Sequence, residues 1–83
     1  MNPEQAAAAV RAVLASIAPE ADLDALGPDA QLQEELDLDS MNFLDLMAGI
    51  HERTGIDVPE RDYPLVATLA GCISYLCSHA PAA

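Results

Sequence analysis

Apolar and polar residues recur along this chain with the spacing of an α-helix. In three stretches the apolar side chains return every three or four residues, which places them on one helix face. This pattern predicts helices over about residues 3–18, 40–54 and 69–79, with a short helix over about 59–63. No stretch shows the strict alternation of a β-strand and no internal repeat appears, so the chain is expected to be entirely helical.

The first helix carries clear signals at both ends. Asn2 can act as its N-cap, Pro3 fits the first helical position, and Gln5 completes a capping-box pattern. Pro19 disfavours helical geometry in the residue before it, so the helix is expected to end there.

The later helices carry similar signals. Ser40 stands at the start of the second helix, where a serine ordinarily serves as the N-cap, and Gly55 is suited to end it. Pro64 is expected to end the short helix, and Thr68 to cap the last one.

Between the first two long helices lies a connection over residues 19–39. It holds eight of the chain's fourteen acidic residues and no basic residue. A disordered linker has no need of large apolar residues. We therefore predict an ordered loop, with a short turn of helix at residues 21–26, held to the core by five leucines: Leu23, Leu26, Leu32, Leu36 and Leu38.

These elements predict an all-α fold, a small four-helix bundle with three main helices, one short helix and a long first loop. With 83 residues the chain is expected to form a single domain over residues 1–83. Its 52% of hydrophobic residues include one Phe, two Tyr and no Trp, so the core must be largely aliphatic. We assign Leu44, Met47, Ile50 and Ile73 to that core.

The charge is strongly one-sided, because fourteen acids face three arginines and no lysine. A net charge of −11 argues against binding to nucleic acids or to anionic membranes. It favours partners with basic patches, which such a charge attracts during encounter. We expect a monomer.

Cys72 and Cys77 are five residues apart in a predicted helix, too far to form a disulfide without distortion. We expect free thiols that fill space in the core, which suits a reducing compartment. The N-terminus has no basic stretch typical of a signal peptide, and no apolar run approaches a membrane span. These features predict a cytoplasmic protein.

Hydrolase chemistry at Ser40 would require a base within hydrogen-bonding reach. His51 is eleven residues further along the same helix, about 16 Å away. His79 is near the C-terminus and no nucleophile-elbow motif is present, so a catalytic serine is not expected.

A calcium loop beginning at Asp37 is also not expected. Such a loop requires glycine at its sixth position and a bidentate acid at its twelfth, but Asn42 and Ala48 stand there. No cluster of histidines and cysteines suggests zinc.

The run Leu36-Asp37-Leu38-Asp39-Ser40-Met41, followed by Leu44-Asp45-Leu46, resembles the acyl carrier protein family, including the related peptidyl carrier domains. The resemblance extends over nearly the whole chain, to Ile56-Asp57-Val58-Pro59 and Thr68-Leu69. The family has glycine where this chain has Asp37, and leucine where it has Met41. Aspartate tolerates left-handed backbone geometry better than most residues, so the turn can be kept.

This resemblance implies a carrier, not an enzyme. Ser40 would accept 4′-phosphopantetheine from coenzyme A, transferred by a separate Mg²⁺-dependent phosphopantetheinyl transferase, and the arm's thiol would carry acyl groups as thioesters. The family pattern gives Asp39 a part in orienting the transferase. Docking to partners would use the second helix through Met41, Asp45, Ala48 and Glu52, and the bulky Phe43 beside Ser40 could alter partner choice.

The expected cargo is a fatty-acid-like or polyketide-like acyl group, whose chain could enter between the aliphatic helices. The expected partners are the transferase, an acyl-loading ligase or acyltransferase, and synthase or acyl-processing enzymes with basic docking patches. Two alternatives remain open at this point: an aminoacyl or peptidyl carrier of nonribosomal biosynthesis, and an unmodified acidic helical adaptor.

Overall fold

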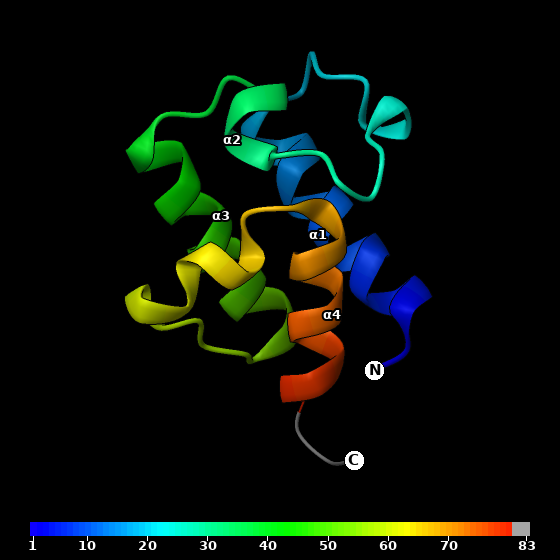
Figure 1. Ribbon diagram of the computed structural model, residues 1–83, viewed down its shortest axis with the longest axis vertical. Helices are drawn as coiled ribbons and strands as arrows, with labels where there is room; N and C mark the ends of the chain where they lie inside the picture. Colours follow the sequence, from blue (N-terminus) through cyan, green and yellow to red (C-terminus); the bar gives the residue numbers. More distant parts are fainter. Residues whose placement is uncertain (81–83) are drawn as a thin grey trace.

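Three long α-helices and one shorter helix carry the fold of the computed structural model (Figure 1). The structure describes residues 1–80; residues 81–83 of the predicted domain lie outside this range. The long helices are α1 (Pro3–Ile17), α3 (Ser40–Thr54) and α4 (Leu69–His79). The predicted all-α bundle is confirmed, and within residues 1–80 no helix is long and apolar enough to cross a membrane.

The predicted capping box of α1 is present. The Gln5 N–H donates to Asn2 Oδ1 at 2.8 Å, and the Asn2 N–H donates to Gln5 Oε1 at 3.0 Å. The helix ends at Ile17, one residue before the predicted end, because Ala18 has a non-helical φ of −129°. This conformation agrees with the restriction that a following proline imposes.

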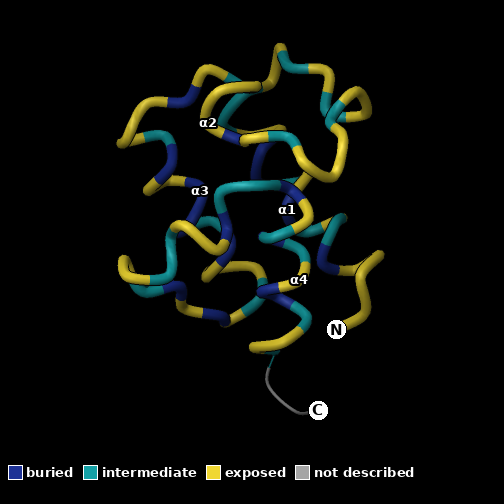
Figure 2. Tube along the Cα trace, viewed as in Figure 1, coloured by how far each residue is buried: buried dark blue, intermediate teal, exposed yellow. Residues whose placement is uncertain are grey.

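The core lies where α1 packs against both α3 and α4 (Figure 2). It is mostly aliphatic, as predicted, and no polar or charged residue of the described chain is buried in it. Sequence reasoning overlooked Tyr75, which is buried on α4. The residues that are fully enclosed and largest are Leu14, Leu32, Leu46, Ile50, Leu76, Val10, Val66 and Cys72.

The face of α3 that enters the core differs in part from the prediction. Phe43, Leu46, Met47 and Ile50 are buried, whereas Leu44, which we assigned to the core, is 51% exposed. The residues that we assigned to the core, Leu44, Met47 and Ile50, are three residues apart. At this spacing each side chain is rotated by about 60° around the helix axis from the one before it. The buried set instead follows the helical period of 3.6 residues, which takes Leu44 out of the core.

The long connection contains more structure than predicted. A 3₁₀ turn, η1 (Leu23–Ala25), forms within the predicted turn, and a four-residue helix, α2 (Leu32–Glu35), was not predicted. Leu32 is fully buried, and its N–H donates to Ala67 O at 2.9 Å. The leucines therefore do hold the loop to the core, but main-chain bonds to a distant segment also fix it.

The short helix, η2 (Glu60–Val66), is a 3₁₀ helix that runs past Pro64, so the predicted end at that proline is wrong. The fixed φ of proline, near −65°, falls within the range of a 3₁₀ helix, and Pro64 therefore fits inside it. η2 packs on α4, where the Tyr75 hydroxyl donates to Asp62 Oδ2 at 2.7 Å. This hydrogen bond raises the pKa of Tyr75, because ionisation would bring two negative oxygens together.

Both cysteines on α4 are free thiols, as predicted. Cys72 is fully buried, and burial raises the pKa of its thiol to about 12 because a thiolate would lose its hydration. Cys77 is half-buried. Cys72 therefore acts as a small apolar filler of the core.

Gly71 allows η2 and α4 to approach closely. A Cβ atom at this position would meet the main-chain oxygen of Leu65 and lie 2.9 Å from Thr68 Oγ1. We predict that Gly71→Ala lowers the free energy of unfolding by roughly 1–3 kcal/mol, because main chain cannot move aside as a side chain can. Urea unfolding would measure the change. Gly27→Ala is the matched control, since a Cβ atom at Gly27 would have no neighbour within 4 Å, and equal stability of the two variants would contradict the close contact.

Candidate functional site

A sharp turn brings the chain to the start of α3. Asp37 has a positive φ of 52°, the left-handed geometry that we expected this aspartate to tolerate. The Leu38 N–H then donates to Gln33 O at 2.9 Å, and the Leu38 side chain is buried. The next two residues, Asp39 and Ser40, consequently lie exposed at a corner between α2 and α3.

Asp39, not Ser40, is the N-cap of α3, which corrects the prediction. Its Oδ1 accepts a hydrogen bond from the Asn42 N–H at 2.7 Å, and the Asn42 side chain accepts from the Asp39 N–H at 3.4 Å. Aspartate and serine are equally good caps, so residue type alone did not distinguish them. The distinguishing signal is Asn42, three residues after Asp39, which allows a reciprocal capping box.

Ser40 is therefore the first residue inside the helix, and its hydroxyl has no role in capping. The residue is exposed, and its Oγ forms no hydrogen bond with the described residues. The positive end of the α3 dipole lies at the same place. The arrangement presents an unengaged hydroxyl at a site that favours an attached anion.

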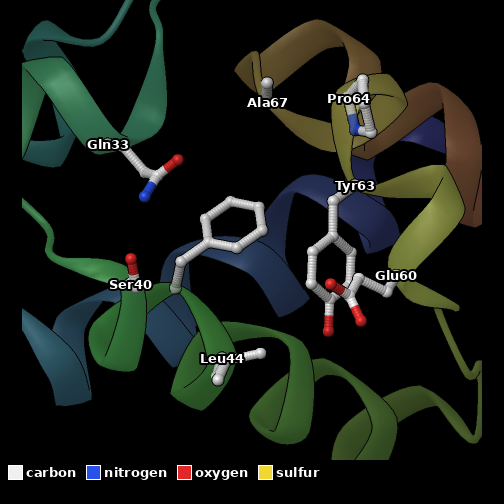
Figure 3. A pocket seen from close by; sticks show the side chains of 8 residues that line it. Gln33, Ser40, Leu44, Glu60, Tyr63, Pro64 and Ala67 are labelled. Atoms are coloured by element: carbon white, nitrogen blue, oxygen red, sulfur yellow. The ribbon is translucent and has the colours of Figure 1, made fainter.

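A pocket of about 500 Å³ opens beside Ser40, between α3 and η2 (Figure 3). Phe43 and Tyr63 meet in it edge to face, with ring centroids 5.4 Å apart and planes at 70°. Sequence reasoning did not find this pocket, because its walls come from three separate parts of the chain. The lining residues are Gln33, Ser40, Phe43, Leu44, Glu60, Tyr63, Pro64 and Ala67.

Both histidines of the chain lie away from Ser40. No histidine lines the pocket: His51 is in the last turn of α3, and His79 is at the end of α4. The His79 ring stacks on Tyr75, with centroids 3.9 Å apart, and its Nδ1 lies 2.9 Å from Tyr75 O. Among residues 1–80 no three or more His, Cys, Asp or Glu side chains are grouped so that they could hold a metal ion.

The four α3 residues predicted to dock partners share one exposed stripe. Met41, Asp45, Ala48 and Glu52 follow one another at intervals of four, three and four residues, which keeps them on the same helix face. Met41 is 74% exposed. The last three also line a groove between α1 and α3, so acidic and apolar groups lie together along this stripe.

Comparison with known proteins finds a family described as "Phosphopantetheine attachment site", which matches residues 8–76. The chain is 31% identical over 67 residues to an acyl carrier protein of Streptomyces coelicolor, covering 81% of this chain and 73% of that one. It is 29% identical over 58 residues to an acyl carrier protein of Lactobacillus johnsonii, covering 70% and 72%. For an acyl carrier protein of Rubrobacter xylanophilus the identity is 25% over 52 residues, covering 63% and 64%.

The cap of α3 can be tested by its effect on stability. We predict that Asp39→Ala lowers the free energy of unfolding by roughly 0.5–2 kcal/mol, because the Asn42 N–H loses its acceptor. Asp39→Asn keeps an acceptor oxygen and should retain most of this stability. Thermal unfolding of both variants would measure the difference, and a loss in Ser40→Ala as large as in Asp39→Ala would contradict the assignment of the cap.

Proposed function

The chain belongs to the acyl carrier protein family, and we propose that it carries acyl groups as thioesters on a 4′-phosphopantetheine arm attached to Ser40. Proteins of this family are carriers, not enzymes, and hold 4′-phosphopantetheine as their covalent cofactor. The observation that carries the proposal is the free, exposed hydroxyl of Ser40 at the start of α3, inside the matched residues 8–76.

The other serines of the chain fit the arm less well. Ser16 lies near the end of α1, while Ser74 and Ser78 lie in the middle and last turn of α4. Ser40 alone among the four begins a helix. A phosphodiester there gains from the unpaired N–H groups of the first helical turn and from the helix dipole.

The residues around Ser40 supply only part of what transfer of the arm requires. They expose the hydroxyl at the corner between α2 and α3, and no histidine lines the pocket beside it. We propose that the transferase supplies the base and the metal ion. We assign Asp39 a part in orienting that enzyme, in addition to capping the helix. The bound arm would supply a thiol on which the cargo is exchanged.

Partners would dock on the stripe formed by Met41, Asp45, Ala48 and Glu52. Its two carboxylates are exposed and attract basic patches, while Met41 and Ala48 offer apolar contact. Carrier proteins generally interact with transferases and synthase enzymes. For this chain we propose the phosphopantetheinyl transferase, an acyl-loading ligase or acyltransferase, and enzymes of fatty-acid-like or polyketide-like biosynthesis.

Attachment of the arm can be tested by mass spectrometry. After incubation with coenzyme A and a broad-specificity transferase, the unaltered chain should gain one phosphopantetheine. We predict that Ser40→Ala abolishes this gain, because the acceptor oxygen is removed. Ser16→Ala and Ser74→Ala are matched controls that should leave it unchanged. A chain that gains no arm would support the adaptor alternative.

If partners dock on α3, the rate at which the arm is transferred should depend on the negative charge of this helix. Asp45→Asn and Glu52→Gln should each slow transfer of the arm at low concentrations of the carrier, by roughly twofold to tenfold, because the attraction to a basic patch weakens. The rate for the unaltered chain should also fall as salt rises, since screening acts beyond about 8–10 Å. Glu4→Gln, on α1, is the control. Equal rates for all four proteins would show that the acidity does not guide docking.

A further inference from the structure

The pocket beside Ser40 has an aromatic floor. Phe43 is only 6% exposed, and Tyr63 meets it edge to face across the space between α3 and η2. Leu46 and Ile50, on the same face of α3 as Phe43, are both fully buried in the packed core. A long saturated chain could pass deeper only by separating the two rings and displacing closely packed side chains.

The rim of the same pocket is polar. Glu60 and Tyr63 are three residues apart in a 3₁₀ helix, where side chains at this spacing lie one above the other. Figure 3 shows both on one side of the pocket, with Gln33 and Ser40 on the other. None of the three polar side chains Gln33, Glu60 and Tyr63 forms a hydrogen bond with another described residue. Their polar groups are therefore free to bind an occupant.

The charge of this rim indicates which occupants it favours. The Glu60 carboxylate is an acceptor only, and the nearby hydroxyl and amide can also accept. The pocket contains no basic residue, so a cargo that ends in a carboxylate would be repelled. A cargo with a hydroxyl or amino group could donate to Glu60.

The packed floor limits how much of the cargo can enter the protein. The pocket is open to solvent, and the buried side chains on the same face of α3 as Phe43 leave no further space in the core. Because Ser40 itself lines the pocket, the arm would occupy part of this space. A short acyl group can lie beside it without entering the packed core.

We propose that this pocket selects short acyl groups bearing a hydrogen-bond donor, either a hydroxyl or an amino group, over saturated chains, with Glu60 and Tyr63 as the residues that determine specificity. The proposal rests on the proposed role of Ser40 as the point of attachment. It narrows the cargo of the carrier without depending on any particular pathway.

The preference can be measured on the unmodified chain by NMR titration. The probes are acyl-pantetheine analogues in which an amide replaces the thioester. Their acyl groups are hexanoyl, 3-hydroxyhexanoyl, 3-aminohexanoyl and dodecanoyl, and they differ in nothing else. We expect the hydroxyl and amino probes to bind roughly threefold to tenfold more tightly than the hexanoyl probe, the usual gain from one added hydrogen bond. The shifts should centre on Glu60, Tyr63 and Ala67.

Two variants separate the contributions of the two proposed acceptors, the Glu60 carboxylate and the Tyr63 hydroxyl. Glu60→Gln should remove most of the gain in affinity of the amino probe over the hexanoyl probe, because the ionic acceptor is lost. It should remove only part of the corresponding gain of the hydroxyl probe. Tyr63→Phe should reduce the advantage of the hydroxyl probe while leaving the fold intact. Glu4→Gln removes an exposed acid on α1, outside this pocket, and should change neither affinity.

Several results would overturn the proposal. One is tighter binding of the hexanoyl or dodecanoyl probe than of the donor-bearing probes, and another is a set of shifts centred on Leu46 and Ile50. The absence of any shift at millimolar probe is a third. None of these results would affect the mass-spectrometric test for an arm on Ser40. The two experiments together therefore distinguish a carrier with another cargo preference from a chain that carries no arm.

Discussion

The hydrogen bond from the Asn42 N–H to the Asp39 carboxylate determines where α3 begins, and the rest of the site depends on that starting point. With the cap at Asp39, Ser40 becomes the first helical residue and keeps its hydroxyl free. In the helix that begins there, Phe43 is buried in the core and Met41 is exposed to solvent. The attachment point, the Phe43 part of the pocket floor and the docking stripe therefore all lie on α3.

Features encoded by neighbouring residues were predictable from the sequence. The capping box at Asn2, the left-handed end at Gly55 and the cap at Thr68 are local, and they located the three long helices to within a residue. The unpredicted features arise from contacts between distant segments. α2 exists because Leu32 is buried and its N–H bonds to Ala67 O, and neither fact is visible in the four residues of that helix. The position of Ser40 followed from its motif, whereas the pocket required three segments to be brought together.

Three sides of α3 serve three purposes. One side, with Leu46 and Ile50, belongs to the core. A second, with Asp45 and Glu52, faces solvent beside α1, and a third, with Ser40 and Leu44, lines the pocket beside η2. Exposure of Leu44, which the apolar pattern alone assigns to the core, is explained by this third side. A partner can thus contact the acidic stripe without covering the pocket.

The hydrogen bond between Tyr75 and Asp62 attaches η2 to α4. A movement of η2 that widened the pocket would have to break this bond to a charged acceptor, or take the first turns of α4 along with it. Close packing at Gly71 opposes the same movement. The wall of the pocket is therefore preorganised: little conformational entropy remains to be lost when an occupant arrives, and its affinity reflects mainly the contacts that it makes.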